Sequence, residues 1–173
     1  MGLLDGALGK LREVAERTGQ AKPAGAGRDL PPIPDLATLV TQEEIREVTG
    51  GSPEGTPRTN GADGMEVDLG RLVIWEARLS NGGEFLITLS ACFDEAAANL
   101  GMDRMAEVEH KPLDGVGERG LVRVKSYRKQ GTSEVGVTAH KGRYNLSLTH
   151  TTADGATEYG PLTELLRKAL DRL

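Results

Sequence analysis

The sequence has one cysteine, few aromatic residues and no long run of apolar residues. Because Cys92 stands alone, it cannot form a disulfide within the chain, which excludes a disulfide-stapled fold. One Trp, three Tyr and two Phe leave a core made mostly of Leu, Val, Ile and Ala. No apolar run approaches the roughly 20 residues that cross a bilayer, and charges interrupt the N-terminal apolar positions where a signal peptide would be continuous. We expect a cytoplasmic protein in which Cys92 is buried and inert.

The charge is unevenly distributed along the chain. The net charge is −5, which argues against general nucleic-acid binding. Residues 42–118 carry 16 acids and 6 bases, whereas residues 119–143 carry 7 bases and 1 acid. Strict alternation in "LVRVKSYRK" places two of these cations on the exposed face of a strand. The sequence predicts either a solvated sheet face or an anion- or ligand-binding strip, formed by Arg123, Lys125, Arg128, Lys141 and Arg143.

Three segments follow one another along the chain. Residues 1–19 have an apolar stripe at helical spacing and predict an amphipathic helix. Residues 20–34, rich in Pro, Gly and Ala, predict a linker, and residues 35–173 predict the folded domain.

The apolar stripe of the first segment needs a covering surface, either on its own domain or on a protein partner. Three acids balance three bases in this segment, so attraction to a membrane is not expected. The residues predicted to bind a partner are Leu4, Leu8, Leu11 and Val14.

Helix signals in the domain begin at four places. Asp35 could cap a short turn, and Thr41 with Glu44 forms a capping box whose helix buries Ile45. Asp94 caps a helix running to about residue 108, with Ala98, Met102, Met105 and Val108 turned inward. A last helix begins with Pro161 in its first turn.

Strand signals dominate the rest of the domain. "SNGG" joins two strands with Ala77 opposite Ile87, and Lys141-Gly142 joins two more with Val137 opposite Leu146. Strands are also expected at 65–69 and 121–127, whereas 52–64 is expected to be a polar loop. The predicted fold is α+β: a mostly antiparallel sheet of five to six strands with helices packed on one face, preceded by the N-terminal helix and linker.

The stretch "DGVGERGLVRV" contains G-x-G-x-x-G at Gly115, Gly117 and Gly120. A dinucleotide site needs a strand before these glycines and a helix after them, and here the order is reversed. No kinase catalytic-loop motif follows either. The pattern therefore predicts a sharp turn in which the glycines adopt positive φ angles.

Neither a metal centre nor a catalytic site is expected from the residue spacing. The three histidines, His110, His140 and His150, lack ligand spacing, and the last two fall at opposite ends of the second hairpin. A nucleophilic pair of Cys92 with a histidine stays open, although a buried thiol is the commoner outcome. We expect no catalytic residues, no metal and no cofactor.

The ordering of "LATLVTQEEIREVTGG", a central hairpin, "PLDGVGERG" before a strand and a closing hairpin with helix resembles one known group. It resembles actinobacterial lipoproteins of unknown function and the related extracellular sensor domains of mycobacterial serine/threonine kinases, over about 35–173. The resemblance implies a sensor-like or ligand-binding module. Those relatives are exported, so this chain would be a cytoplasmic version in which a helix and linker replace the export signal.

These observations together favour a non-enzymatic binding or adaptor module. Its N-terminal helix would recruit a protein partner, and the sheet face or the cleft beside the glycine turn would hold a small ligand. Two alternatives stay open: a small enzyme that uses Cys92 or a carboxylate, and a structural subunit that inserts its helix into a neighbour.

Overall fold

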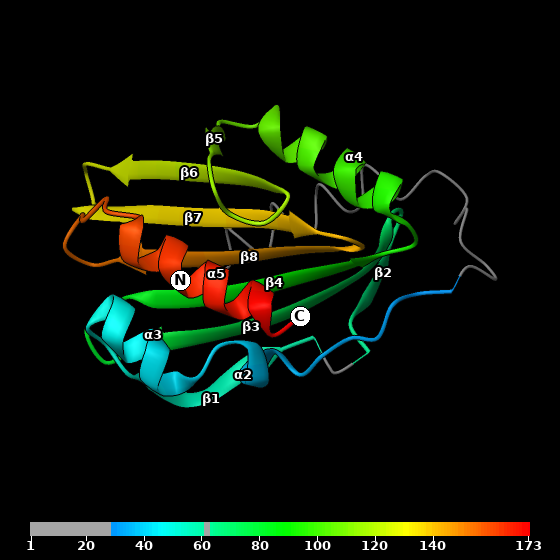
Figure 1. Ribbon diagram of the computed structural model, residues 1–173. Coiled ribbons are helices and arrows are strands. Elements are labelled where there is room, and N and C mark those ends of the chain that lie inside the picture. Colours follow the sequence, from blue (N-terminus) through cyan, green and yellow to red (C-terminus); the bar gives the residue numbers. More distant parts are fainter. Residues whose placement is uncertain (1–28, 61–62) are drawn as a thin grey trace.

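The computed structural model describes residues 29–60 and 63–173 and shows an eight-stranded sheet with four helices (Figure 1). All the strand pairs are antiparallel, in the order β1-β3-β4-β8-β7-β6-β5, and β2 also pairs with β3. The strands are β1 (Pro53–Thr59), β2 (Met65–Val67), β3 (Gly70–Leu79), β4 (Glu84–Cys92), β5 (Lys111–Leu113), β6 (Arg119–Tyr127), β7 (Thr132–Lys141) and β8 (Tyr144–Thr152). The helices are α2 (Leu36–Leu39), α3 (Gln42–Thr49), α4 (Glu95–Ala106) and α5 (Gly160–Asp171).

The predicted α+β class and mostly antiparallel sheet are confirmed, although the described part of the chain has more strands than the expected five to six. The predicted N-terminal helix, residues 1–19, lies outside the described residues. Within the described ranges no helix is both long and apolar enough to cross a membrane.

The main core lies between the sheet and α5, with α2 and α3 beside that helix (Figure 1). Alternation along β4 buries Phe85, Ile87 and Leu89 on one face of the sheet, and β8 adds its own apolar residues to the same face. Leu165 and Leu166 of α5 complete the core and are also fully buried. Burial of each such side chain contributes roughly 1.5–3 kcal/mol, so this layer supplies most of the driving force for folding.

Helix α4 packs on the opposite face of the sheet, which corrects the expectation that all helices share one face. Asn145 of β8 points away from the core residue Leu146, and its Nδ2 donates to the carbonyl oxygen of Ala98 at 2.9 Å. Glycine at position 101 allows this close packing, because a Cβ there would lie 2.9 Å from the same Nδ2 and the amide would have to shift. The expected inward position Val108 is instead 54% exposed. The apolar stripe of α4 is thus too short to indicate its orientation from sequence.

Both predicted hairpins form, but each has a register shifted by two residues. Ala77 pairs with Phe85 rather than Ile87, and Val137 pairs with Leu148 rather than Leu146. The second hairpin turns at Gly142 and the residue after it, one position later than expected. A shift of two leaves every side chain on its original face, so the pattern of apolar residues cannot detect it.

The segment predicted as a polar loop, 52–64, contains the edge strand β1. This strand pairs with β3 through a bulge, where Gly55 has a φ of 68°. Most of its side chains are exposed. Main-chain hydrogen bonding to β3 therefore stabilises the strand without any apolar alternation that the sequence could reveal.

Three predicted helix caps are confirmed, and at the first of them the side chain of Asp35 accepts from the amide of Ala37 at 3.0 Å. Thr41 and Glu44 form the reciprocal capping box, and the side chain of Asp94 accepts from the amide of Ala97. Glu44 also binds Arg172 near the C-terminus, with its Oε1 2.6 Å from Nη2 of the arginine. This ion pair joins the start of α3 to the end of α5.

The last residues of the predicted linker pack against the domain. The Tyr144 hydroxyl donates to the carbonyl oxygen of Pro32 at 2.5 Å, and Arg143 donates to that of Asp29. Ile33 packs against the main core. The folded unit therefore begins before Asp35.

Candidate functional site

The glycine pattern forms the turn between β5 and β6, as predicted. Gly115 and Gly117 have φ angles of 71° and 60°. Gly120 is needed for a different reason than expected: its φ is not positive, but a Cβ there would lie 2.4 Å from the carbonyl oxygen of Leu113. A Cβ on Gly117 would lie 2.4 Å from the carbonyl oxygen of His140. The glycines bring the turn onto the end of β7.

The structure does not gather the predicted basic strip into one cluster. Arg123 pairs with Glu134, and Lys125 lies 2.8 Å from a carboxylate oxygen of Glu109. The other cations lie elsewhere: Lys141 donates to the carbonyl oxygen of Leu170 at 2.6 Å, Arg143 donates to that of Cys92 at 3.3 Å, and Arg128 follows the end of β6. An anion site on this strip stays a prediction.

Other predicted residues can also be located. The partner-binding set Leu4, Leu8, Leu11 and Val14 lies outside the described residues. Cys92 is 2% exposed, and burial, reinforced by the nearby Asp94 carboxylate, raises the pKa of its thiol to about 11. A thiol in this state is a poor nucleophile at neutral pH.

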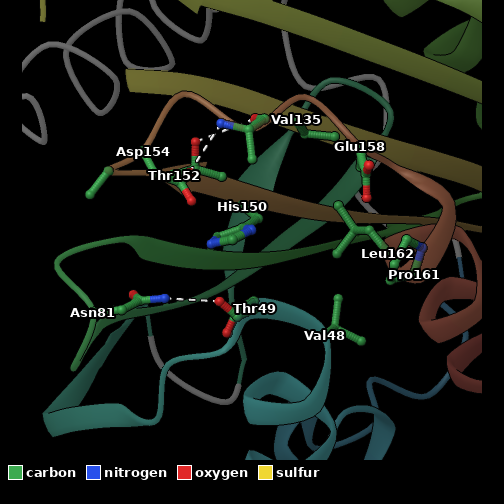
Figure 2. A pocket seen from close by; sticks show the side chains of 12 residues that line it. Val48, Thr49, Asn81, Val135, His150, Thr152, Asp154, Glu158, Pro161 and Leu162 are labelled. Atoms are coloured by element: carbon green, nitrogen blue, oxygen red, sulfur yellow. Dashed lines mark hydrogen bonds between the residues drawn. The ribbon is translucent and has the colours of Figure 1, made fainter. Parts of the chain in front are cut away.

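A cavity of about 320 Å³ opens at the end of the sheet where α3, β8 and the start of α5 meet (Figure 2). Its apolar wall includes Val48, Val135 and Leu162. Its polar groups come from four places: the C-terminus of α3, the β3–β4 turn, the end of β8 and the segment before α5. These polar residues are Thr49, Asn81, His150, Thr152, Asp154 and Glu158.

His150 stands at the centre of this cavity wall (Figure 2). It pairs with Phe85 and Val135, so it occupies an inward-facing position of β8. Its Nε2 is buried and has no hydrogen-bond partner in the part of the chain that the structure describes. Burial lowers the pKa of the imidazole below 6.5, only partly opposed by Asp154, so the ring is neutral at pH 7.

The shape of the cavity depends on the β3–β4 turn. Asn81 donates to the carbonyl oxygen of Thr49 at 2.8 Å and accepts from the amide of Gly83 at 3.1 Å, which ties this turn to the end of α3. A Cβ on Gly83 would lie 3.3 Å from Nε2 of His150. The "SNGG" sequence therefore builds a cavity wall as well as a hairpin.

Charge at the cavity has one sign. Asp154 and Glu158 supply carboxylates at its exposed rim, and none of the described residues that line it is Lys or Arg. The amide of Ala156 donates to Asp154 at 3.0 Å, and this hydrogen bond lowers the pKa of that carboxyl. The rim therefore favours a cation or a hydrogen-bond donor.

A second cavity, about 470 Å³, lies beside the glycine turn. It is lined almost entirely by neighbouring residues of one stretch, 110–121, with Ala106 from α4. The first cavity has the better-built site, because several separate elements converge on it around a buried imidazole.

Sequence reasoning missed the role of His150 and a group formed by Glu95, Glu118 and His140. Alternation with Leu146 and Leu148 could have placed His150 on the core face. The second group has no sequence signal, because its members come from α4, the β5–β6 turn and β7.

Comparison with protein-family models and with curated proteins gives no match for this chain. A proposal for its function therefore depends on the geometry of these sites.

Proposed function

We propose that the chain is a non-enzymatic binding module that takes a small molecule in the His150 cavity. The expected ligand has a compact apolar body and a primary amine or similar cation. The observation that carries this proposal is a cavity of about 320 Å³ that joins an apolar wall to a neutral, incompletely hydrogen-bonded imidazole.

The size and lining support a small-molecule site. Binding pockets for small ligands span roughly 300–1,000 Å³ and combine apolar walls with a few converging polar groups. Here Val48, Val135 and Leu162 would contact the body of the ligand, while Thr49 and Asn81 offer polar groups on the opposite side from Thr152 (Figure 2).

The electrostatics favour a cation. The carboxylates of Asp154 and Glu158 would attract an ammonium group. At neutral pH the imidazole of His150 would not oppose it, because burial lowers the pKa of this ring. A carboxylate ligand would meet two like charges and no lining cation among the described residues.

Binding without turnover is favoured by the state of Cys92, which is one of the two kinds of group, with a carboxylate, on which the enzymatic alternative would rest. Its thiol is buried on the sheet face opposite the main core, and burial raises its pKa to about 11. The resemblance to sensor domains implies the same kind of role, that of a ligand-binding module.

Partner recruitment by the predicted helix of residues 1–19 stays part of this proposal. The described chain begins at Asp29, which Arg143 holds beside the β7–β8 turn. A pull-down with the full chain and with Leu8→Asp tests recruitment, and capture that is equal with both baits would contradict it.

The test of ligand binding is a titration of ¹⁵N-labelled protein with benzylamine, followed by amide chemical shifts. We expect saturable shifts at Asn81, at residues 152–158 and in the first turn of α5, and no such shifts with benzoate. Benzyl alcohol, which is uncharged, should bind more weakly than benzylamine, because it cannot form a charge pair with the rim carboxylates.

Two variants locate the site. Ala156→Phe places a ring on the rim, and Asp154→Asn removes one carboxylate; each should weaken the binding of benzylamine. Asp171→Asn, an exposed acid of α5 outside the cavity, is the matched control. Absence of saturable shifts at millimolar benzylamine, or binding that Ala156→Phe leaves unchanged, would contradict the proposal.

A further inference from the structure

On the sheet face opposite the His150 cavity, His140 of β7 is buried with an unused ring nitrogen. The side chain is 1% exposed, and its Nε2 has no hydrogen-bond partner among the described residues. The nearest charged group is Oε2 of Glu118, at 3.4 Å from Nε2. A carboxylate of Glu95 completes a group of three possible ligand atoms that all lie within 4.8 Å of one another.

The hydrogen bond of the second ring nitrogen, Nδ1, determines the tautomer of His140. Nδ1 lies 3.2 Å from Oδ1 of Asn145. The orientation of this amide is set because its Nδ2 donates to the carbonyl oxygen of Ala98 at 2.9 Å. Nδ1 must therefore carry the hydrogen, and in the neutral ring Nε2 presents its lone pair to Glu118. The same arrangement prepares histidines for metal binding, since a hydrogen bond at one nitrogen orients the other toward the ion.

The glycine turn places Glu118. Because Gly117 has no Cβ, the turn can approach β7 closely enough for the amide of Glu118 to donate to the carbonyl oxygen of His140 at 2.9 Å. Oε1 of Glu118 then accepts from the amide of Gly142 at 2.8 Å. The carboxylate is held at one oxygen, and the other oxygen faces the imidazole.

Close packing of α4 brings the third group. Gly101 lets the helix lie against Asn145, and this contact places the first turn of α4, with Glu95, beside the end of β7. Glu95 is exposed, so its side chain can move to complete a site. A single ion there would gain ligands from a helix, a turn and a strand.

We propose that His140, Glu118 and Glu95 form a site for a divalent transition metal, with Zn²⁺ as the best fit. Zinc binds His nitrogen at about 2.0–2.1 Å and carboxylate oxygen at about 2.0–2.2 Å in tetrahedral sites, which puts neighbouring ligand atoms about 3.4 Å apart. The observed separation of Nε2 and Oε2 is 3.4 Å. One imidazole with two carboxylates suits Zn²⁺ or Mn²⁺ better than Mg²⁺ or Ca²⁺, which prefer oxygen ligands alone. A water would occupy the fourth position.

The site is distinct from the proposed ligand cavity, and it can be tested independently. All three histidines and the one cysteine of the chain lie in the described residues. The experiment uses the full chain without a histidine tag, freed of metal by a chelator and titrated with zinc chloride by calorimetry. Imidazole ¹⁵N resonances are recorded in the same titration, with those of His110 and His150 as internal references.

We expect one Zn²⁺ per chain and a large shift of the His140 Nε2 resonance, with His110 and His150 little changed. Glu118→Gln keeps the acceptor for the Gly142 amide but removes the charge, and Glu95→Gln alters an exposed side chain. Each should weaken zinc binding about ten-fold or more. Glu107→Gln, an exposed acid at the other end of α4, is the control and should bind as the unaltered chain does.

Three results would overturn the proposal. The first is the absence of zinc binding at millimolar concentration. The second is binding that shifts His110 or His150 instead of His140. The third is affinity that both glutamine variants retain while their circular dichroism spectra match that of the unaltered chain.

Discussion

Replacing Gly117 with Ala tests how the glycine turn is fitted to the sheet. Gly117 has a φ of 60°, and the new Cβ would lie 2.4 Å from the carbonyl oxygen of His140 and 3.2 Å from the Cβ of Ala139. Because the first of these atoms belongs to the backbone of a central strand, the turn must move. Gly131 is a matched control, since its φ is 66° and a Cβ there meets nothing within 4 Å.

The two variants should differ in their free energy of unfolding, because only Gly117→Ala creates a steric clash. A non-glycine residue in the left-handed region costs roughly 1–2 kcal/mol, partly offset by about 0.4–1 kcal/mol from the stiffer unfolded chain. Gly131→Ala should therefore lower the free energy of unfolding by about 1 kcal/mol or less. Gly117→Ala adds overpacking of about 1–3 kcal/mol and should lower it by about 2–4 kcal/mol.

Urea unfolding followed by circular dichroism measures the free energy of unfolding of both variants. The slope of this free energy against urea concentration should stay unchanged. Zinc titration of the folded variants adds a second readout, because movement of the turn separates Glu118 from His140. If the two variants lose equal stability, within about 0.5 kcal/mol, the close approach of the turn to β7 is refuted.

Three further predictions concern single titratable groups. Hydrogen bonding to Arg172 lowers the pKa of Glu44 to about 2, so its contribution to stability is present above pH 4.5 and is lost as the pH falls toward 2. Glu44→Gln should therefore lower the free energy of unfolding by about 1 kcal/mol or less at pH 7 and by still less at pH 2; an equal loss at both values would contradict this. His150 is a base rather than an acid, and burial lowers its pKa below 6.5 in the folded chain. As the pH falls, the histidine of the unfolded chain is protonated first, so stability falls as the pH drops below 6.5. His150→Gln should reduce this fall between pH 7 and pH 5, and an unchanged pH profile would count against burial of the ring. Cys92, with its pKa raised to about 11 by burial, should react with a thiol reagent at pH 8 at least about 100-fold more slowly than free cysteine and rapidly in urea; fast labelling of the folded chain would show that the thiol is accessible.

The sequence predicted those parts of the fold that local chemistry determines. Thr41 and Asp94 mark helix starts because their side chains cap free amides, and these hydrogen bonds depend only on nearby residues. The turns at "SNGG" and Gly142 mark hairpins for a similar reason.

Other parts of the fold depend on contacts that sequence patterns do not encode. The registers were wrong by two residues because such a shift preserves the face of every side chain. β1 was missed because main-chain pairing to β3 holds it at the sheet edge. The position of α4 on the second face depends on Gly101 fitting against Asn145, residues 44 apart in the chain.

Each candidate site also combines a feature that the sequence indicates with contacts that only the folded chain creates. Alternation along β8 could have placed His150 on the core face, but the cavity around it is made by Asn81 and the segment before α5, which no periodicity connects. The glycine pattern was correctly interpreted as a turn, yet its effect on Glu118 and His140 arises only when β5–β6 folds onto β7.

The most direct test of ligand binding at the His150 cavity is the pKa of His150, measured by NMR in the free protein and with saturating benzylamine. We expect the bound ammonium group to lower this pKa further, because it adds a positive charge beside a ring that burial already keeps neutral. A pKa of His150 that saturating amine leaves unchanged would contradict the proposed site.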